Sequence, residues 1–440
     1  MSNSFFSHIK KRAAFELWMQ IHQSPSALMR VWQLWRTQRI VAIAYTHVPM
    51  YRKLMDDTGI VPAGIRKFSD IQKLPVINKQ FLQKQQWEDS THSILRNFQN
   101  SYRMALTSGS TGEPFSFPQS TNAFLHPGYS AKPLRANPLL FRFLFWQGHS
   151  FEDIYEKMRV AGIRIYNLPC VKNYLYIPVR MLHDDDNGLL EKITYFRPDI
   201  LEGRTSVLVE FARLLKEHGE KMKLPFIITH GETINNAQLE YFEKMLGSKP
   251  YSRYSLEEVP DVAIDCALHT GLHVHEESLL LEILDNADKP VAPGVPGRLV
   301  ITHFENEIMP FIRYDTGDVG MIVPGICPCG IRARRIKIHT RKQGGFVAIG
   351  NKKYHISEFE AFFDEFADFV LQFQIVKRNE KIIEIRILPT LRYSRIHEEE
   401  LKNKFREYFK TDTIIRLVKS IRYEGEEKAR FIIDETAFSR

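Results

Sequence analysis

The pattern of apolar and polar positions predicts a helix close to the N-terminus. The Ser-Pro pair at positions 24–25 is typical of a helix start, because serine caps the first turn and proline fits its first position. Four apolar residues then recur at helical spacing, namely Leu28, Val31, Trp32 and Trp35. We expect this face to pack into the core.

Between residues 102 and 254, short apolar runs alternate with helical patterns. The run 226–228 is strand-like, and the apolar positions within 208–215 follow a helical period that ends near Gly219. This alternation is typical of helices layered on a sheet, so it predicts an α/β arrangement.

The pattern changes after about Arg341. A helical stretch begins near Ser357, two strand-like runs flank residues 377–381, another helix carries Leu401 and Phe409, and 413–418 is again strand-like. We therefore predict an α/β chain with a large, multi-layer N-terminal domain at 1–340 and a small α+β C-terminal domain at 341–440.

Composition is that of a chain that packs throughout. Of the 440 residues, 44% are apolar and 25% are charged, so long disorder is not expected. No apolar stretch approaches the roughly 18–20 residues that a membrane span needs, and the N-terminus lacks the apolar segment of a secretion signal. The four cysteines are too few for a disulfide scaffold. These features favour a cytoplasmic protein.

The net charge of +8 raises the question of nucleic-acid binding. The basic residues are spread along the chain rather than gathered in one block, which favours a solvated surface that also suits anionic substrates such as nucleotides. We expect no nucleic-acid partner.

A candidate phosphate loop follows the strand-like run 103–106. It consists of Thr107, Ser108, Gly109, Ser110, Thr111 and Gly112. The glycines permit close backbone approach, and clustered N–H and hydroxyl groups can donate to phosphate oxygens. The loop is not a Walker A motif, since Glu113 and Pro114 stand where Lys and Ser or Thr would follow. From composition alone, a surface turn is the alternative.

Two segments carry a family resemblance. The string 107–114 resembles the signature loop of adenylate-forming enzymes, the acyl- and aryl-coenzyme A synthetases, in the branch of phenylacetate–coenzyme A ligases and capsular polysaccharide biosynthesis proteins. The string 313–318 is nearly identical to the Arg-Tyr-x-Thr-Gly-Asp motif of this family. The resemblance implies that Asp318 accepts hydrogen bonds from the ribose hydroxyls.

Looser matches occur between these two motifs. Gly231 and Glu232 fall where the family has a turn that lines the acyl and adenine sites. The string 254–258 resembles the Tyr-Gly-Ser-x-Glu turn, which implies that Tyr254 packs near adenine and Glu258 holds Mg²⁺. Ser255 replaces the glycine, a loss of conformational freedom if the turn needs a positive φ.

The C-terminal part resembles the family lid. Arg341 stands at the family hinge and is implied to contact ribose or phosphate, while Gln343 replaces the usual hinge residue. Lys428 matches the lysine that reaches the α-phosphate and acyl carboxylate, although no glycine precedes it directly. The resemblance implies a nucleotide and acid site in residues 1–340 and a mobile lid at 341–440.

The activity that the resemblance implies is activation of a carboxylic acid with ATP and Mg²⁺, with Lys428, Glu258 and Arg341 as catalytic residues. Coenzyme A, an amine or a hydroxyl would then accept the acyl group. An alternative is a nucleotide-binding family member without catalysis, in polysaccharide or secondary-metabolite biosynthesis. A homodimer is compatible with the sequence.

Three cysteines and a histidine form a candidate metal site. Cys266 and His273 make one pair and Cys327 with Cys329 the other, and thiolate and imidazole ligands suit tetrahedral Zn²⁺. His269 or His275 could replace His273 as ligand. Similar cysteine positions occur in the phenylacetate ligase branch, and the alternative is a set of free thiols. Four protein ligands would leave no open position, so a structural zinc is expected.

Overall fold

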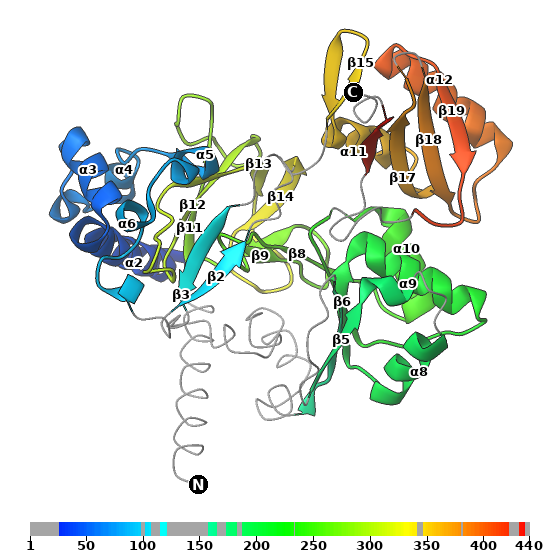
Figure 1. Cartoon of the computed structure of the whole chain (residues 1–440), viewed down its shortest axis with the longest axis horizontal. Helices are drawn as coiled ribbons and strands as arrows, with labels where there is room; N and C mark the ends of the chain where they lie inside the picture. The colour runs from blue at the N-terminus through cyan, green and yellow to red at the C-terminus, as the bar shows by residue number, and fades with distance from the viewer. Residues whose placement is uncertain are drawn as a thin grey trace. The chain divides into compact units, whose positions relative to one another are not determined.

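The computed structural model describes residues 26–97, 102–106, 115–120, 157–164, 173–182, 187–232, 234–340, 346–379, 382–421 and 431–435. These residues divide into two compact units. Unit 1 contains the described residues of 26–158 and 253–340, and unit 2 contains those of 159–252 and 346–435. In Figure 1, unit 1 is blue, cyan and yellow-green to yellow, and unit 2 is green and gold to red.

Unit 1 begins with helices that cover one part of its core. Its α-helices are α2 (Ser26–His47), α3 (Pro49–Thr58), α4 (Phe68–Ile71), α5 (Lys79–Gln83) and α6 (Trp87–Ser90). A proline in the first turn of α3 and the left-handed Gly59 at its end set the limits of that helix.

Helix α2 exists as expected, but the predicted buried face is wrong. Leu28, Val31 and Trp35 are exposed, and Trp32 is only half-buried. The buried face includes polar side chains, foremost Arg36, which forms a 2.8 Å ion pair with Glu305. The apolar period indicates the wrong face because the polar side chains of the buried face bond to partners far along the chain. These bonds offset the cost of removing the polar groups from water.

The strands of unit 1 form a largely antiparallel sheet. They are β8 (Tyr251–Tyr254), β9 (Ala263–Ile264), β10 (Leu272–Val274), β11 (Leu279–Leu284), β12 (Gly297–His303), β13 (Tyr314–Val323) and β14 (Arg335–Thr340). Their order is β11-β12-β13-β14-β10-β9-β8, and β1 (Ile77–Asn78) adds to β13 in parallel. A separate hairpin joins β2 (Tyr102–Leu106) to β3 (Ser116–Ser120).

Arg313, directly before β13, links this sheet to the N-terminal helices. Its guanidinium is buried and pairs with Glu282 of β11 at 3.1 Å. It also donates to the carbonyl oxygens of Gln72 and Leu74. All of these partners lie inside the protein, so this one side chain connects β11 with the segment that precedes β1.

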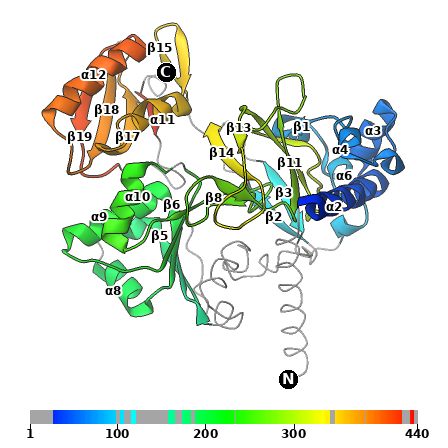
Figure 2. The ribbon, with the colours of Figure 1, turned by 180° about the vertical axis from the view of Figure 1, so that it is seen from behind.

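Unit 2 contains a parallel sheet with helices. Its strands β4 (Val160–Arg164), β5 (Tyr174–Pro178), β6 (Ile200–Arg204) and β7 (Phe226–His230) have the order β7-β6-β4-β5. Its helices are α8 (Asn187–Phe196), α9 (Thr205–Glu217) and α10 (Asn236–Leu246). The expected strand at 226–228 and the helix that ends near Gly219 are confirmed, and these helices lie beside the sheet in Figure 2.

The rest of unit 2 has a sheet and an aromatic core of its own. A hairpin of β15 (Phe346–Ile349) and β16 (Lys352–His355) precedes a mixed sheet of order β19-β18-β17-β20. Its elements are α11 (Ile356–Asp364), β17 (Val370–Lys377), β18 (Ile383–Pro389), α12 (Arg395–Phe409), β19 (Thr413–Leu417) and β20 (Ile432–Asp434). The expected elements are confirmed, whereas the domain boundary near residue 340 stays a prediction.

Within the residues that the structure describes, no helix combines the length and the apolar character needed to cross a bilayer.

Replacing Arg313 with Ala should lower the free energy of unfolding by about 3–5 kcal/mol, because Glu282 would keep a buried charge without its partner. Denaturant unfolding followed by tryptophan fluorescence measures this. Arg39→Ala, which breaks the more exposed pair with Glu307, is the matched control and should be nearly neutral. Equal stability of the two variants would contradict the structural role of Arg313.

Candidate functional site

The segment 313–318 forms a bulge in β13. Asp315 pairs with Val300 and Val319 pairs with Arg298, so three residues of β13 lie opposite Leu299 alone. The Thr316 hydroxyl donates to the Leu299 carbonyl at 3.0 Å. Gly317 has a φ of 78°, a conformation that glycine adopts without strain. The bulge therefore changes the direction of the side chain that follows it, Asp318.

Asp318 meets Tyr254 at the end of β8. The Tyr254 hydroxyl donates to Asp318 Oδ2 at 2.7 Å, and both side chains are buried. The backbone N–H of Asp318 donates to the Thr316 hydroxyl at 3.1 Å. Two residues that sequence reasoning assigned to the nucleotide, 64 positions apart, are thus hydrogen-bonded to each other.

Glu258 lies in the turn after β8 and has a tyrosine partner as well. The Tyr314 hydroxyl donates to Glu258 Oε1 at 2.9 Å. Burial raises the pKa of Glu258, against the Tyr314 hydrogen bond and the charge of Lys79, which lower it. A carboxylate that burial makes harder to ionise is well suited to an adjacent cation, because the cation stabilises the charged form.

Ser255 does not strain the turn between Tyr254 and Glu258. Its φ is not positive, so the glycine expected from the family pattern is not required at this position. Its hydroxyl accepts a hydrogen bond from the backbone N–H of Asp261 at 3.2 Å. Ser255 therefore stabilises the turn through this hydrogen bond and causes no backbone strain there.

Gly231 and Glu232 lie in unit 2, directly after β7. Gly231 has a φ of 80°. The Glu232 carboxylate accepts from the backbone N–H of Ser206 at 2.7 Å and from its hydroxyl at 2.8 Å. A carboxylate at this point stabilises the N-terminus of α9, so Glu232 has a structural task whatever else it contacts.

Several predicted site residues lie outside the described residues. These are Thr107, Ser108, Gly109, Ser110, Thr111, Gly112, Arg341 and Lys428. Their assigned roles stay predictions.

The four predicted metal ligands meet between β9, β10 and the β13–β14 connection. The ligand atoms of Cys266, His273, Cys327 and Cys329 all lie within 4.8 Å of one another. The sulfur atoms of Cys266 and Cys327 are 3.8 Å apart, and Cys329 Sγ lies 3.4 Å from His273 Nε2. Tetrahedral Zn²⁺ requires S–S edges of about 3.8 Å and S–N edges of about 3.6 Å, so the residues fit this metal.

The surroundings of the cluster orient its ligands. His273 Nδ1 lies 3.1 Å from the Ala333 carbonyl, which fixes Nδ1 as the donor and leaves Nε2 able to bind a metal. The backbone N–H of Ile331 donates to Cys329 Sγ at 3.4 Å. Of the alternative histidines, His269 lies against Asp265 and His275 near Glu277.

The three thiols of the cluster differ in pKa. Burial raises the pKa of Cys266 to about 12 and also raises that of Cys329, whereas at Cys327 burial is outweighed by hydrogen bonds, including one with Thr270, that lower the pKa. Bound Zn²⁺ would stabilise the thiolate form of each cysteine. The sulfur separation of 3.8 Å between Cys266 and Cys327 is far too long for a disulfide bond.

Comparison with known proteins relates the chain to ligases. No family model matches it. The phenylacetate–coenzyme A ligase of Thermus thermophilus is 24% identical over 373 residues, which cover 82% of this chain and 81% of that protein. The phenylacetate–coenzyme A ligase of Escherichia coli is 28% identical over 324 residues, or 69% of this chain and 70% of that protein.

A solved structure shares the fold. A 2-hydroxyisobutyryl-CoA ligase in complex with R3-HIB-AMP superposes with a TM-score of 0.72 over 95% of this chain and 92% of that one, at 18% identity. The chain therefore has the fold of this ligase. In sequence it is similar to phenylacetate–coenzyme A ligases over more than two thirds of its length.

Sequence reasoning missed Tyr314 as a site residue. It is buried, and it is the hydrogen-bond partner of Glu258. Burial, followed by the nearby Glu258 charge, raises its pKa far above the ordinary value for tyrosine, so it remains a donor at neutral pH. Its place inside the segment 313–318 was a usable signal, but its partner could not be identified without the fold.

Replacing Tyr254 with Phe should cost about 1–3 kcal/mol of folding free energy, because Asp318 Oδ2 would lose its buried donor. Chemical denaturation measures this loss. The control is Tyr45→Phe, which removes an exposed hydroxyl bonded to Asp56 and should leave the unfolding midpoint unchanged. A Tyr254→Phe variant as stable as the parent protein would show that this hydrogen bond does not contribute to the free energy of folding.

Proposed function

We propose that this protein activates a carboxylic acid with ATP and then transfers the acyl group, with coenzyme A as the favoured acceptor. The observation that carries the proposal is the alignment with a phenylacetate–coenzyme A ligase across about four-fifths of both chains. The buried pairs of Tyr254 with Asp318 and of Tyr314 with Glu258 support it, because they join residues that the family resemblance assigns to one nucleotide site.

In the first step, a carboxylate oxygen of the acid attacks the α-phosphorus of ATP. A P–O bond forms as the P–O bond to the leaving pyrophosphate breaks, and an acyl-adenylate results. This step needs stabilisation of negative charge more than proton transfer. Lys428 and Arg341 are the proposed cations, the hydroxyls of 107–112 the proposed phosphate donors, and Asp318 the proposed acceptor for the ribose hydroxyls.

Glu258 is the proposed Mg²⁺ ligand. Its buried carboxylate offers the hard oxygen that Mg²⁺ prefers, and the Tyr314 hydroxyl holds the orientation of that carboxylate. A bound Mg²⁺ would neutralise phosphate charge.

In the second step, the acceptor attacks the acyl carbon. With coenzyme A, a C–S bond forms, the C–O bond to AMP breaks, and the thiol proton leaves. The names of the relatives favour a thiol over an amine or hydroxyl acceptor. No observation favours a protein without catalysis.

The purified protein should release pyrophosphate from MgATP only when a suitable carboxylic acid is present. A panel of aryl and alkyl acids, with coenzyme A or hydroxylamine as acceptor, ranks the substrates.

Lys428→Ala should depress adenylate formation while ATP still binds. Asp318→Asn should weaken ATP binding about tenfold, the effect of losing one charged hydrogen-bond acceptor. Lack of acid-dependent pyrophosphate across the panel would refute the activity.

We also propose a structural zinc ion held by Cys266, His273, Cys327 and Cys329. The mutual distances of these residues and the carbonyl partner of His273 support it. The ligands come from the β9–β10 region and from the β13–β14 connection, so zinc would hold these two parts of the sheet together.

Metal analysis of the purified protein should find about one zinc per chain, as four protein ligands bind a single ion. Cys327→Ser should lose the zinc and lower the melting temperature. Cys170→Ser is the matched control, since Cys170 is outside the proposed ligand set, and should keep both. The proposal would be wrong if the protein as purified contained no zinc and a chelator left its melting temperature unchanged.

A further inference from the structure

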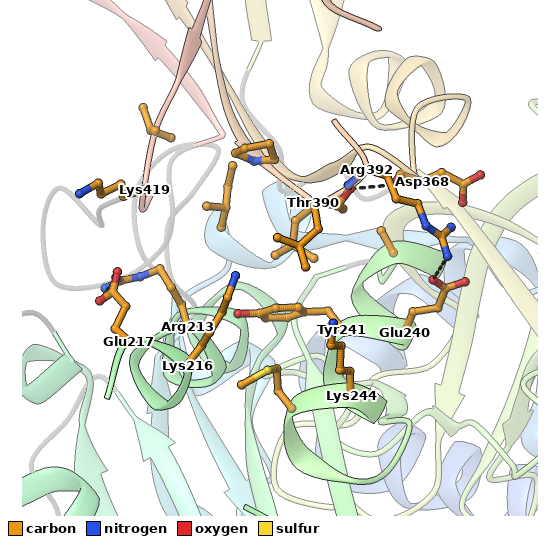
Figure 3. Close-up of a pocket in the computed structure, with 17 residues that line it drawn as sticks. Arg213, Lys216, Glu217, Glu240, Tyr241, Lys244, Asp368, Thr390, Arg392 and Lys419 are labelled. Atoms are coloured by element: carbon orange, nitrogen blue, oxygen red, sulfur yellow. Dashed lines mark hydrogen bonds and ion pairs between the residues drawn. The ribbon is translucent and has the colours of Figure 1, made fainter. Parts of the chain in front are cut away.

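Unit 2 contains a cavity of about 610 Å³ that no step of the proposed reaction uses. Its walls come from α9, α10, the start of β17, the end of β18 with the residues that follow it, and the residues after β19. Figure 3 shows its lining side chains. The volume lies within the range of roughly 300–1,000 Å³ that is typical of small-molecule sites.

The inner surface of the cavity is apolar. Met245, Leu371 and Leu388 line it and are otherwise buried, and Val418 adds a half-buried side chain. Gln238 supports this wall, because its side-chain amide donates to the Leu371 carbonyl at 2.9 Å. An apolar molecule, or the apolar part of one, would therefore be shielded from water here.

The rim of the cavity is cationic. Lys216, Lys244 and Lys419 line it, and none of their ammonium groups forms an ion pair with a described residue. In Figure 3, Lys216 extends from α9 toward the space beside the Tyr241 ring. Lysines without acidic partners around an apolar hollow favour a ligand that carries negative charge.

The acidic side chains of the rim are largely compensated. Glu217 pairs with Arg213, and Glu240 pairs with Arg392 at 3.4 Å. Five basic and three acidic side chains line the cavity, which leaves a net charge of +2. The unpaired lysines account for the excess.

Tyr241 lies between the apolar wall and the charged rim of the cavity, where its hydroxyl can form a hydrogen bond with a ligand. Its hydroxyl forms no hydrogen bond with any residue that the structure describes, and burial, the largest cause, raises its pKa to about 12. The hydroxyl thus stays protonated at neutral pH and can donate to an anionic oxygen.

We propose that this cavity binds a small organic anion, with an apolar body against Met245, Leu371 and Leu388 and its charged group near Tyr241, Lys216 and Lys244. The anion would be a carboxylate or a phosphate ester. The inference uses none of the residues of the proposed adenylation site and does not depend on that activity. Because both segments of unit 2 line the cavity, the ligand would stabilise their packing.

The test is a fluorescence titration of the full-length protein with 1-anilinonaphthalene-8-sulfonate. N-phenyl-1-naphthylamine, which lacks the sulfonate, is the matched neutral ligand. The anionic probe should saturate and bind at least about tenfold more tightly, a difference of about 1.4 kcal/mol. Displacement by 1-naphthoate or by 1-naphthyl phosphate then shows whether the site prefers a carboxylate or a phosphate; displacement by neither would overturn the proposal.

Variants localise the binding. The double variant Lys216→Gln with Lys244→Gln should weaken the anionic probe about tenfold and leave the neutral one unchanged. Lys249→Gln, at an exposed lysine beyond the cavity paired with Glu243, is the control and should bind as the parent does. Equal affinity of the double variant and the parent, or equal loss in Lys249→Gln, would overturn the proposal.

Discussion

A buried guanidinium must find all of its partners inside the protein, and Arg313 imposes this constraint on unit 1. Its charge is matched by Glu282 on β11, and two of its N–H groups are matched by carbonyls of residues 72 and 74. These contacts join a segment near the N-terminus to strands that lie more than 200 residues later. The short strand β1, which follows this segment, pairs with β13 in parallel.

The same strand then directs the candidate site. Past Arg313, the bulge of β13 turns Asp318 toward Tyr254, while Tyr314 reaches Glu258. Asp318 of segment 313–318 thus accepts a hydrogen bond from Tyr254 of segment 254–258. Glu258 of segment 254–258 in turn accepts one from Tyr314 of segment 313–318. Reciprocal hydrogen bonds of this kind fix carboxylate orientation, which binding of a ribose or a cation requires.

The cysteine and histidine cluster and the cavity show how polar groups gather at other points of the chain. At the cluster, the register of β10 with β14 places His273 against Arg335, close to the connection that carries Cys327 and Cys329. At the cavity, lysines that have no acidic partner among the described residues surround an apolar wall. In both places the chemistry depends on which side chains the packed chain brings together.

The sequence by itself determined the α/β class, the elements with a strong apolar period such as α9 and β7, and three of the four residues that meet in the cluster, Cys266, Cys327 and Cys329. It did not determine the buried face of α2, because Arg36 is compensated by Glu305, 269 positions away. Nor could it choose His273 over His269 and His275, or find Tyr314 as the partner of Glu258. Local patterns report the burial of apolar residues, whereas buried polar groups depend on partners that only the tertiary structure brings within hydrogen-bond distance.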